Sequence, residues 1–180
     1  MVRKPIVFQV AGYQNSGKTT LVKKIIKHLT SSGFAVATIK HHGHGGKPDM
    51  IENKDSGQHI SSGALASLVE GEGRILLQLE KNSWTLDEQI EILMPLKLDI
   101  IIIEGHKHKD YPKVVILRNI EDQHLLSKLK NIKAVLYWDP FKEISSIQSE
   151  YSAIPFFEIH DNNGDEWIVS YLQNEINGIR

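Results

Sequence analysis

One eight-residue stretch constrains this chain of 180 residues more than any other feature. Residues 12–19 read Gly-Tyr-Gln-Asn-Ser-Gly-Lys-Thr and match the pattern G-x-x-x-x-G-K-[ST] at every fixed position. A short β-branched stretch, 6–10, precedes the motif, and leucine and isoleucine recur at helical spacing over 21–29 after it. A strand that leads into a helix through such a loop directs backbone N–H groups and the positive helix end at one phosphate. The sequence therefore predicts a binding site for a nucleoside triphosphate.

Seven residues of this loop are expected to contact the nucleotide: Gly12, Asn15, Ser16, Gly17, Lys18, Thr19 and Thr20. The two glycines let the backbone curl around an anion without Cβ clashes. Lys18 should reach the β- and γ-phosphate oxygens, which also makes it a candidate catalytic group. Thr19 should bind Mg²⁺ through its hydroxyl, and Thr20 should lie near the α-phosphate.

A carboxylate for the metal side of the site is expected at the end of another strand. Residues 100–103 are four consecutive isoleucines, a pattern typical of a central parallel strand covered on both faces. Ligands gather at the carboxyl ends of the strands in a doubly wound sheet, so Glu104 should emerge beside the phosphate loop. We predict that Glu104 is a catalytic carboxylate that binds Mg²⁺, and that Gly105 lets the backbone approach the γ-phosphate.

Loop carboxylates supply three more candidates. Asp49 and Asp55 follow the second predicted strand and leave from the same edge of the sheet, where either could bind Mg²⁺ or position a water molecule. Asp55 is the favoured candidate because it lies just before a possible helix that begins near Gln58. Asp139 follows the predicted strand 134–138 and could accept hydrogen bonds from guanine, although a role as a turn former is equally open.

The pattern of the remaining elements predicts one α/β domain over residues 1–180. Segments 66–69 and 75–79 flank Glu-Gly-Glu-Gly, which predicts a β-hairpin. Further strands are expected at 34–39, 114–117, 134–138 and 154–157, and further helices near 90–96, 123–129 and 165–176. The fold class is that of the P-loop NTPases, with three layers, a mostly parallel central sheet and the added hairpin.

Composition argues against several classes of protein. The 21 basic and 22 acidic residues leave a formal charge of -1, without the basic excess of a nucleic-acid or anionic-membrane binder. The chain has no cysteine, which removes disulfides, thiol catalysis and iron–sulfur clusters and fits a reducing cytoplasm. The apolar stretch 6–11 is too short for a signal peptide or an anchor. We expect a cytoplasmic protein that binds neither nucleic acid nor a membrane.

Four ordered blocks of sequence are more specific together than the phosphate loop is alone. They are 10–21, then Thr-Ile-Lys-His-His at 38–42, then Asp55-Ser56 with His59 and Ser-Gly-Ala at 62–64, and last Ile-Glu-Gly-His-Lys at 103–107. In this combination the chain resembles the molybdopterin-guanine dinucleotide biosynthesis adapter proteins, the MobB family. The segment 42–49 departs from the family pattern by being richer in glycine, which leaves the role of Asp49 open.

The resemblance implies a GTP-binding protein with weak GTPase activity and with GTP and Mg²⁺ as cofactors. It would assist the MobA-type molybdopterin guanylyltransferase, which joins GMP to molybdopterin, and it would form a homodimer. Molybdopterin or the molybdenum cofactor is a further candidate ligand. The family pattern places 12–20 on the triphosphate, Lys40, His41 and Asp55 in its second conserved block, and Glu104 and Gly105 in its third.

Three other functions are compatible with the residues, and one of them is a non-enzymatic adapter in which bound GTP only orders the segment 41–58 for a partner. A small-molecule kinase uses the same loop, although the four arginines are scattered through the sequence rather than clustered. A GTP-driven metal-insertion chaperone would use histidines as nickel or zinc ligands. Six of the nine histidines fall in segments expected at the phosphate edge: His41, His42, His44, His59, His106 and His108. Guanine specificity does not follow from the sequence, which has no matching N-K-x-D motif.

Overall fold

The computed structural model describes residues 4–42, 46, 54–138 and 143–179. The chain forms two compact units, one made of Met1–His41 with Ile90–Arg180 and the other of His42–Gln89. The first unit contains a six-stranded sheet and the second a two-stranded hairpin. No helix in the described ranges is long and apolar enough to cross a membrane.

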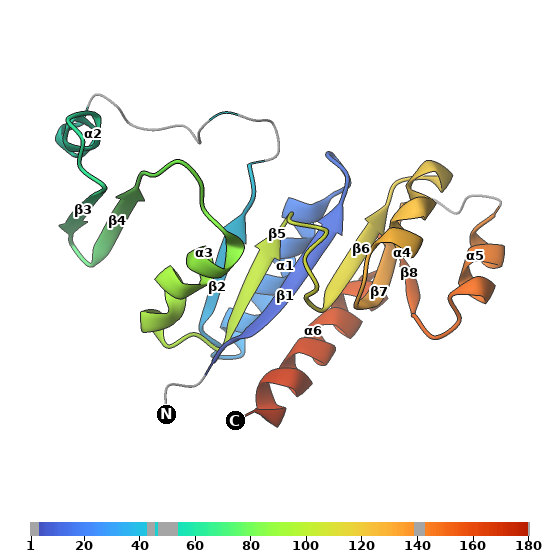
Figure 1. The fold of residues 1–180 in the computed structure, drawn as a ribbon. Coiled ribbons are helices and arrows are strands. Elements are labelled where there is room, and N and C mark those ends of the chain that lie inside the picture. Colours follow the sequence, from blue (N-terminus) through green and yellow to red (C-terminus); the bar gives the residue numbers. More distant parts are fainter. Residues whose placement is uncertain (1–3, 43–45, 47–53, 139–142, 180) are drawn as a thin grey trace. The chain divides into compact units, whose positions relative to one another are not determined.

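The first unit is built on a sheet with the strand order β2-β5-β1-β6-β7-β8, in which every pairing is parallel (Figure 1). Its strands are β1 (Ile6–Gly12), β2 (Val36–Lys40), β5 (Ile100–Glu104), β6 (Lys113–Leu117), β7 (Ile132–Tyr137) and β8 (Phe156–Glu158). The isoleucine strand β5 lies inside the sheet, between β2 and β1, and β8 forms an edge. The predicted α/β, P-loop NTPase-like fold class is confirmed.

Helices cover both faces of this sheet because successive strand residues point to opposite faces and both sets are apolar. On one face Phe8 and Val10 share a core with α1 (Lys18–Ser31) and α6 (Asn162–Gly178). On the other face Ala11 belongs to a second core, which it shares with α4 (His124–Lys128) and α5 (Ile144–Glu150). The 3₁₀ helix η2 (Ile120–Gln123) directly precedes α4. The helical spacing of Leu21, Ile25 and Leu29 places all three in the first core.

The connection between β5 and β6 was not predicted. The two strands flank β1, and residues 105–112 join them across β1 without a helix (Figure 1). Parallel strands usually need a connection of a dozen or more residues. Here β6 begins opposite Gln9 while β5 ends opposite Val10, so the connection only has to cross the width of β1.

The second unit contains α2 (Asp55–Ser61) and the predicted hairpin, formed by β3 (Ala66–Gly71) and β4 (Arg74–Leu79). Its turn is shorter than the four residues expected, because only Glu72 and Gly73 lie between the strands. Both have positive φ, 49° and 80°, which suits the twist of a two-residue hairpin turn. Next in the sequence come α3 (Leu86–Leu93) and the 3₁₀ helix η1 (Met94–Leu96), which contains Pro95.

Candidate functional site

The loop between β1 and α1 has the curled backbone that its glycines predict. Gly12, Asn15 and Gly17 have φ of 154°, 58° and 93°. A Cβ atom at Gly12 would lie 2.7 Å from Ser16 Oγ, so a side chain does not fit there. Gly17 is the N-cap of α1 and supplies no side-chain cap, and the helix begins at Lys18. The loop therefore presents a helix N-terminus to an anion.

Two side chains inside the loop fit a phosphate group. Lys18 Nζ donates a hydrogen bond to the carbonyl of Tyr13 (2.6 Å), so the ammonium group bridges the loop. The hydroxyl of Ser16 is fully buried and has no hydrogen-bond partner among the described residues. A phosphate oxygen would give this hydroxyl the acceptor that it lacks.

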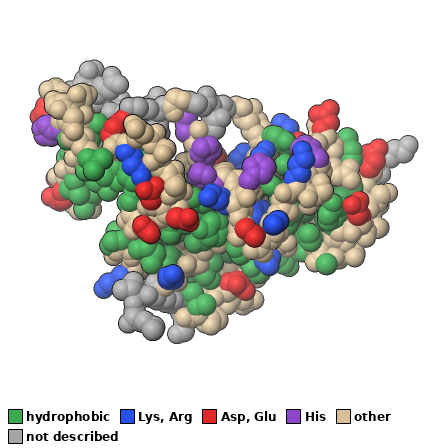
Figure 2. Space-filling view, in the orientation of Figure 1, with side chains coloured by type: hydrophobic (Ala, Val, Ile, Leu, Met, Phe, Trp, Pro, Cys, Tyr) green, Lys and Arg blue, Asp and Glu red, His purple; other side chains and the backbone are tan. Residues whose placement is uncertain are grey.

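Positive charge is concentrated around the loop. Burial lowers the pKa of Lys18, and Glu104 raises it in part, while three more cations lower it further: Lys40, Lys107 and Arg118. In the space-filling view, basic and histidine side chains gather over the carboxyl ends of the central strands (Figure 2). A polyanion in the loop would offset this mutual repulsion.

On the metal side, the structure brings Thr19 and Glu104 together. Thr19 Oγ1 donates a hydrogen bond to Glu104 Oε1 (2.8 Å), and Glu104 is buried at the end of β5. Lys40 Nζ lies 3.2 Å from the same Glu104 oxygen and 3.3 Å from Thr19 Oγ1. A hydroxyl and a carboxylate are ligands that Mg²⁺ accepts beside phosphate oxygens, so this pair fits the predicted ion.

The segment after β5 bends sharply beside the loop. Gly105 has a φ of 101°, and a Cβ atom there would lie 3.0 Å from His41 Cβ. Its N–H group donates to the carbonyl of Val10 (3.2 Å). His106 also has positive φ, 50°, and its ring centroid lies 4.5 Å from that of His41. Two of the histidines predicted at the phosphate edge are thus neighbours there.

Tyr13, the second residue of the loop, is surrounded by polar groups that sequence reasoning did not assign. Lys107 Nζ lies 4.0 Å from the centre of the Tyr13 ring, and the Arg118 guanidinium 5.1 Å from it. The Tyr13 hydroxyl is 2.7 Å from His124 Nε2. Arg118 donates two hydrogen bonds of 2.8 Å to Asp122. Lys107 belonged to the fourth sequence block, but nothing in the sequence indicated its contact with Tyr13.

A pocket of about 170 Å³ adjoins the loop. Its lining residues come from α1, the ends of β7 and β8, and α6: Gly17, Thr20, Leu21, Lys24, Trp138, Ile159, His160 and Asp165. Trp138 Nε1 donates to the carbonyl of Ser16 (3.0 Å). The Trp138 and His160 rings meet edge to face, with their centroids 5.4 Å apart. Sequence reasoning missed this pocket, whose walls are distant in the chain.

The other predicted residues belong to the second unit or fall outside the described part of the chain. Asp55 is the first residue of α2, in the second unit. Asp49, Asp139 and His44 fall outside the described residues. Within the described ranges, no group of three or more His, Cys, Asp and Glu side chains could hold a metal ion. The metal-chaperone alternative therefore gains no ligand set from them.

Comparison with known proteins identifies the family. The family model "Molybdopterin guanine dinucleotide synthesis protein B" (MobB) matches residues 7–138. This chain belongs to the MobB family. A Bacillus subtilis (strain 168) relative, described as a "Probable molybdopterin-guanine dinucleotide biosynthesis adapter protein", is 36% identical over 97% of this chain and 98% of its own length. The adapter of Escherichia coli (strain K12) is 35% identical over 61% of this chain and 63% of its own length.

Solved structures agree with the family assignment. The crystal structure of Bacillus subtilis MobB has a TM-score of 0.75 and 36% identity, covering 92% of this chain and 96% of its own. The MobB homologue from Bacillus stearothermophilus has a TM-score of 0.70 and 34% identity, covering 96% of this chain and 98% of its own. HypB from Helicobacter pylori, solved in complex with nickel, is 13% identical with a TM-score of 0.56 over 97% of this chain and 88% of its own, a likeness of fold alone. The chain is thus an adapter-family protein of molybdopterin-guanine dinucleotide biosynthesis.

Proposed function

We propose that this MobB-family protein binds GTP with Mg²⁺ in its phosphate loop, hydrolyses it slowly, and assists the MobA-type nucleotidyltransferase that attaches GMP to molybdopterin. The observation that carries the proposal is the Thr19–Glu104 contact beside a complete phosphate loop. The loop supplies amides and Lys18 for the phosphates, and the contact supplies two oxygen ligands for the ion. The names of the relatives supply the pathway.

Each group of the site has a proposed task. The backbone of 12–20 and the buried Ser16 hydroxyl hold the triphosphate, and Lys18 leaves the Tyr13 carbonyl to meet the β- and γ-phosphates. Thr19 and Glu104 hold Mg²⁺, which would neutralise charge between the same phosphates. Asp55 remains the candidate for positioning the attacking water, and Gly105 for a close approach to the γ-phosphate.

Slow hydrolysis is proposed because the one described arginine beside the loop is already engaged. Arg118 donates its Nε and Nη2 groups to Asp122 and its Nη1 group to the carbonyl of Gln14 (3.4 Å), so these contacts engage all three guanidinium nitrogens. GTPases that no partner protein assists turn over about 10⁻⁴ to 10⁻² times per second. We expect turnover in this range for the protein alone.

The pocket beside Gly17 is the proposed site of the nucleobase. Trp138, Ile159 and His160 offer it apolar and aromatic walls directly next to the loop. Asp139, which follows Trp138 in the chain, remains the proposed reader of guanine, whose N1–H and amine need an acceptor. Trp138→Ala should therefore weaken the binding of every nucleotide tested.

The homodimer is proposed on the apolar surface of the hairpin. Five large side chains of β3 and β4 are 44–60% exposed: Leu68, Val69, Ile75, Leu76 and Leu77. By their register these side chains lie on both faces of the hairpin. Exposed apolar side chains gathered on one element mark an interaction site, and a two-stranded hairpin is marginal without further packing. A second copy of the chain would cover it.

Calorimetric titration with GTP and with ATP, each with Mg²⁺, tests the nucleotide assignment. We expect GTP to bind more tightly than ATP, and Lys18→Ala to weaken GTP by about 10- to 100-fold, the value of one charge-assisted hydrogen bond of about 1.5–3 kcal/mol. Lys27→Ala, on the exposed side of α1, is the matched control and should change nothing. Unchanged GTP affinity in Lys18→Ala contradicts the assignment.

Hydrolysis assays separate the adapter from the kinase. The adapter proposal expects slow phosphate release that rises when the molybdopterin guanylyltransferase is added. Rapid formation of nucleoside diphosphate that depends on a small hydroxyl acceptor would instead indicate a kinase, and many turnovers per second by the protein alone would contradict weak GTPase activity.

A further inference from the structure

A buried glutamine in β1 is bonded to the segment that follows Glu104. Gln9 is fully buried, and its Nε2 donates to the carbonyls of Gly105 (2.7 Å) and His106 (2.6 Å). These two bonds use both hydrogens of the amide. The opposite amide orientation would place Oε1 against two carbonyl oxygens, so the contact fixes which end of the side chain faces the segment.

The bonded carbonyls belong to a conformation that needs support. Gly105 and His106 are consecutive residues with positive φ, and His106 has a side chain, for which this conformation is uncommon. The bend delivers the next residue, Lys107, to the ring of Tyr13 in the phosphate loop. There the charge of Lys107 acts on Lys18 and lowers its pKa together with burial.

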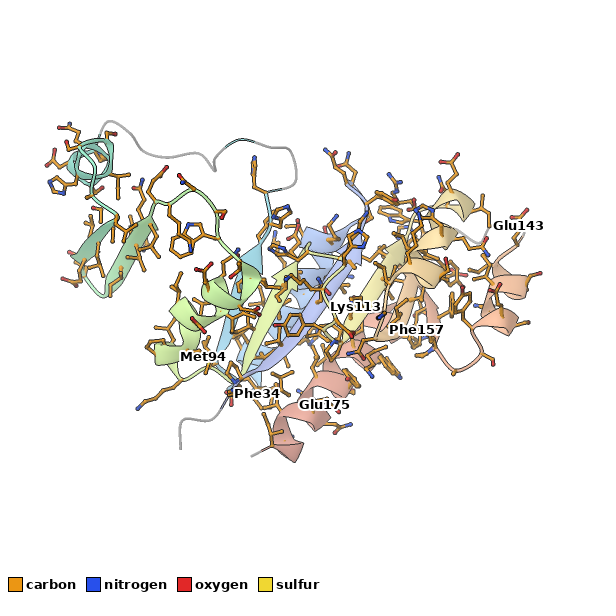
Figure 3. All side chains as sticks on the ribbon, viewed as in Figure 1. Phe34, Met94, Lys113, Glu143, Phe157 and Glu175 are labelled. Atoms are coloured by element: carbon orange, nitrogen blue, oxygen red, sulfur yellow. The ribbon has the colours of Figure 1, made fainter. Side chains whose placement is uncertain are left out.

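A second buried side chain supports the far end of the same connection. Lys113, labelled in Figure 3, is fully buried, and its Nζ donates to the carbonyls of Lys109 (2.9 Å), Tyr111 (2.8 Å) and Lys130 (2.5 Å). Gln9 and Lys113 are register partners in β1 and β6 and therefore point to the same face. Together they satisfy carbonyls that a crossover helix would otherwise satisfy internally. Only the Gln9 end lies against the phosphate loop.

We propose that Gln9 is a positioning residue of the triphosphate site. By fixing the bend at Gly105 and His106, it holds the ammonium group of Lys107 beside the loop, where it meets the third phosphate of a nucleoside triphosphate. The inference rests on the proposed function and deepens it, because it assigns discrimination between GTP and GDP to residues 105–107. The loop amides serve the phosphates that both nucleotides share, and Lys18 meets one of these, the β-phosphate, besides the γ-phosphate.

Among the described residues, no further side-chain hydrogen bond reinforces the contact between Gln9 and this segment. Neither Gln9 Oε1 nor His106 Nε2 has a hydrogen-bond partner among the described residues. Backbone bonds from Gly105 N–H to Val10 and from Lys109 N–H to His106 also hold the bend, and the two Nε2 bonds are its side-chain support. Gln9→Met removes both bonds at similar volume, and Gln9→Glu replaces the donor by an acceptor that repels the two carbonyls.

The test measures the dissociation constants of GTP and GDP, each with Mg²⁺, by calorimetry. We expect Gln9→Met and Gln9→Glu to weaken GTP about tenfold, the value of roughly one hydrogen bond to a charged group, and to change GDP less than about twofold. Lys107→Met should give the same loss. The double variant Gln9→Met with Lys107→Met should lose no more than Lys107→Met alone, because one residue acts through the other.

Lys113→Met is the matched control, since it removes an equally buried donor from the other end of the connection. It should lower the thermal midpoint but leave the ratio of GTP to GDP affinity unchanged. Equal losses of GTP and GDP affinity in the Gln9 variants, or additive losses in the double variant, would overturn the positioning role. If a Gln9 variant does not fold, an unchanged GTP-to-GDP ratio in Lys107→Met overturns it as well. Failure of the unmodified protein to bind GTP would instead refute the proposed function.

Discussion

At the scale of single residues, Lys40 stands where the two proposed Mg²⁺ ligands meet. Its ammonium lies within 3.3 Å of both Thr19 Oγ1 and Glu104 Oε1, so the ion has to displace it. Lys40→Met removes that competition. We expect the Mg²⁺ concentration that half-saturates GTP binding to fall about fivefold, because the competing ion pair of the exposed Lys40 is worth about 1 kcal/mol.

A Mg²⁺ titration of GTP binding checks this expectation. Lys23→Met, an exposed lysine of α1, is the control and should leave the Mg²⁺ requirement as it is. A higher Mg²⁺ requirement in Lys40→Met would mean that Lys40 helps to bind the phosphates rather than occupying the position of the ion.

Gly105 gives a second prediction at this scale. In Gly105→Ala the backbone is strained at a φ of 101°, and the new Cβ atom lies 3.0 Å from His41 Cβ. In Gly33→Ala the backbone is strained at a φ of 81°, but the new Cβ atom has no other atom within 4 Å. We expect about 1 kcal/mol or more of destabilisation from the backbone in each variant. Only Gly105→Ala should also weaken GTP binding, which thermal unfolding and calorimetry on both variants would measure. Equal GTP affinity in the two alanine variants would contradict a role for the bend.

At the scale of elements, we expect the stability of the start of α3 to depend on pH. Glu88 Oε2 accepts hydrogen bonds from the backbone N–H and hydroxyl of Thr85, each 2.8 Å, and Lys81 pairs with the other carboxylate oxygen. These contacts, first the Lys81 hydrogen bond, lower the pKa of Glu88 to about 2. A lowered pKa means that the folded chain binds fewer protons than the unfolded chain, so this stabilisation is present above about pH 4.5 and is lost toward pH 2.

Glu88→Gln tests that linkage. The difference in the free energy of unfolding between the original protein and the variant should be largest above pH 5 and should disappear near pH 2. Chemical denaturation at a series of pH values measures it. A difference that stays constant over this range would show that the charge of Glu88 does not support the helix start.

The sequence predicted those elements whose signals are local. The phosphate loop, the isoleucine strand β5 and the hairpin each have their pattern within ten or so residues, and the parallel order places Glu104 beside Thr19. The helix α5 was missed because its sequence, ISSIQSE, contains three serines, which are weak helix formers. The support of the helix-free connection 105–112 was missed because it comes from Gln9, 96 residues away from Gly105. A polar residue inside an apolar strand was visible, but its partners were not.

At the scale of the whole molecule, the proposed homodimer depends on the hairpin. Leu76→Lys places a charge on an exposed apolar strand and should weaken self-association about tenfold or more, because burial of an unpaired charge is costly. Leu96→Lys, at a leucine that is 61% exposed in η1, is the matched control. Light scattering coupled to size-exclusion chromatography should find the Leu76 variant monomeric at concentrations where the control is dimeric. Equal masses for both variants would place the interface elsewhere.

The central claim is that the curled backbone of residues 12–20 binds a nucleoside triphosphate with Mg²⁺ at Thr19 and Glu104. A crystal structure of the protein with a non-hydrolysable GTP analogue and Mg²⁺ tests it most directly. We expect the triphosphate within the loop, the ion against Thr19 and Glu104, Lys18 moved from the Tyr13 carbonyl to the phosphates, and the base against Trp138. A nucleotide bound elsewhere, with the Lys18–Tyr13 and Thr19–Glu104 contacts still intact, would contradict the account.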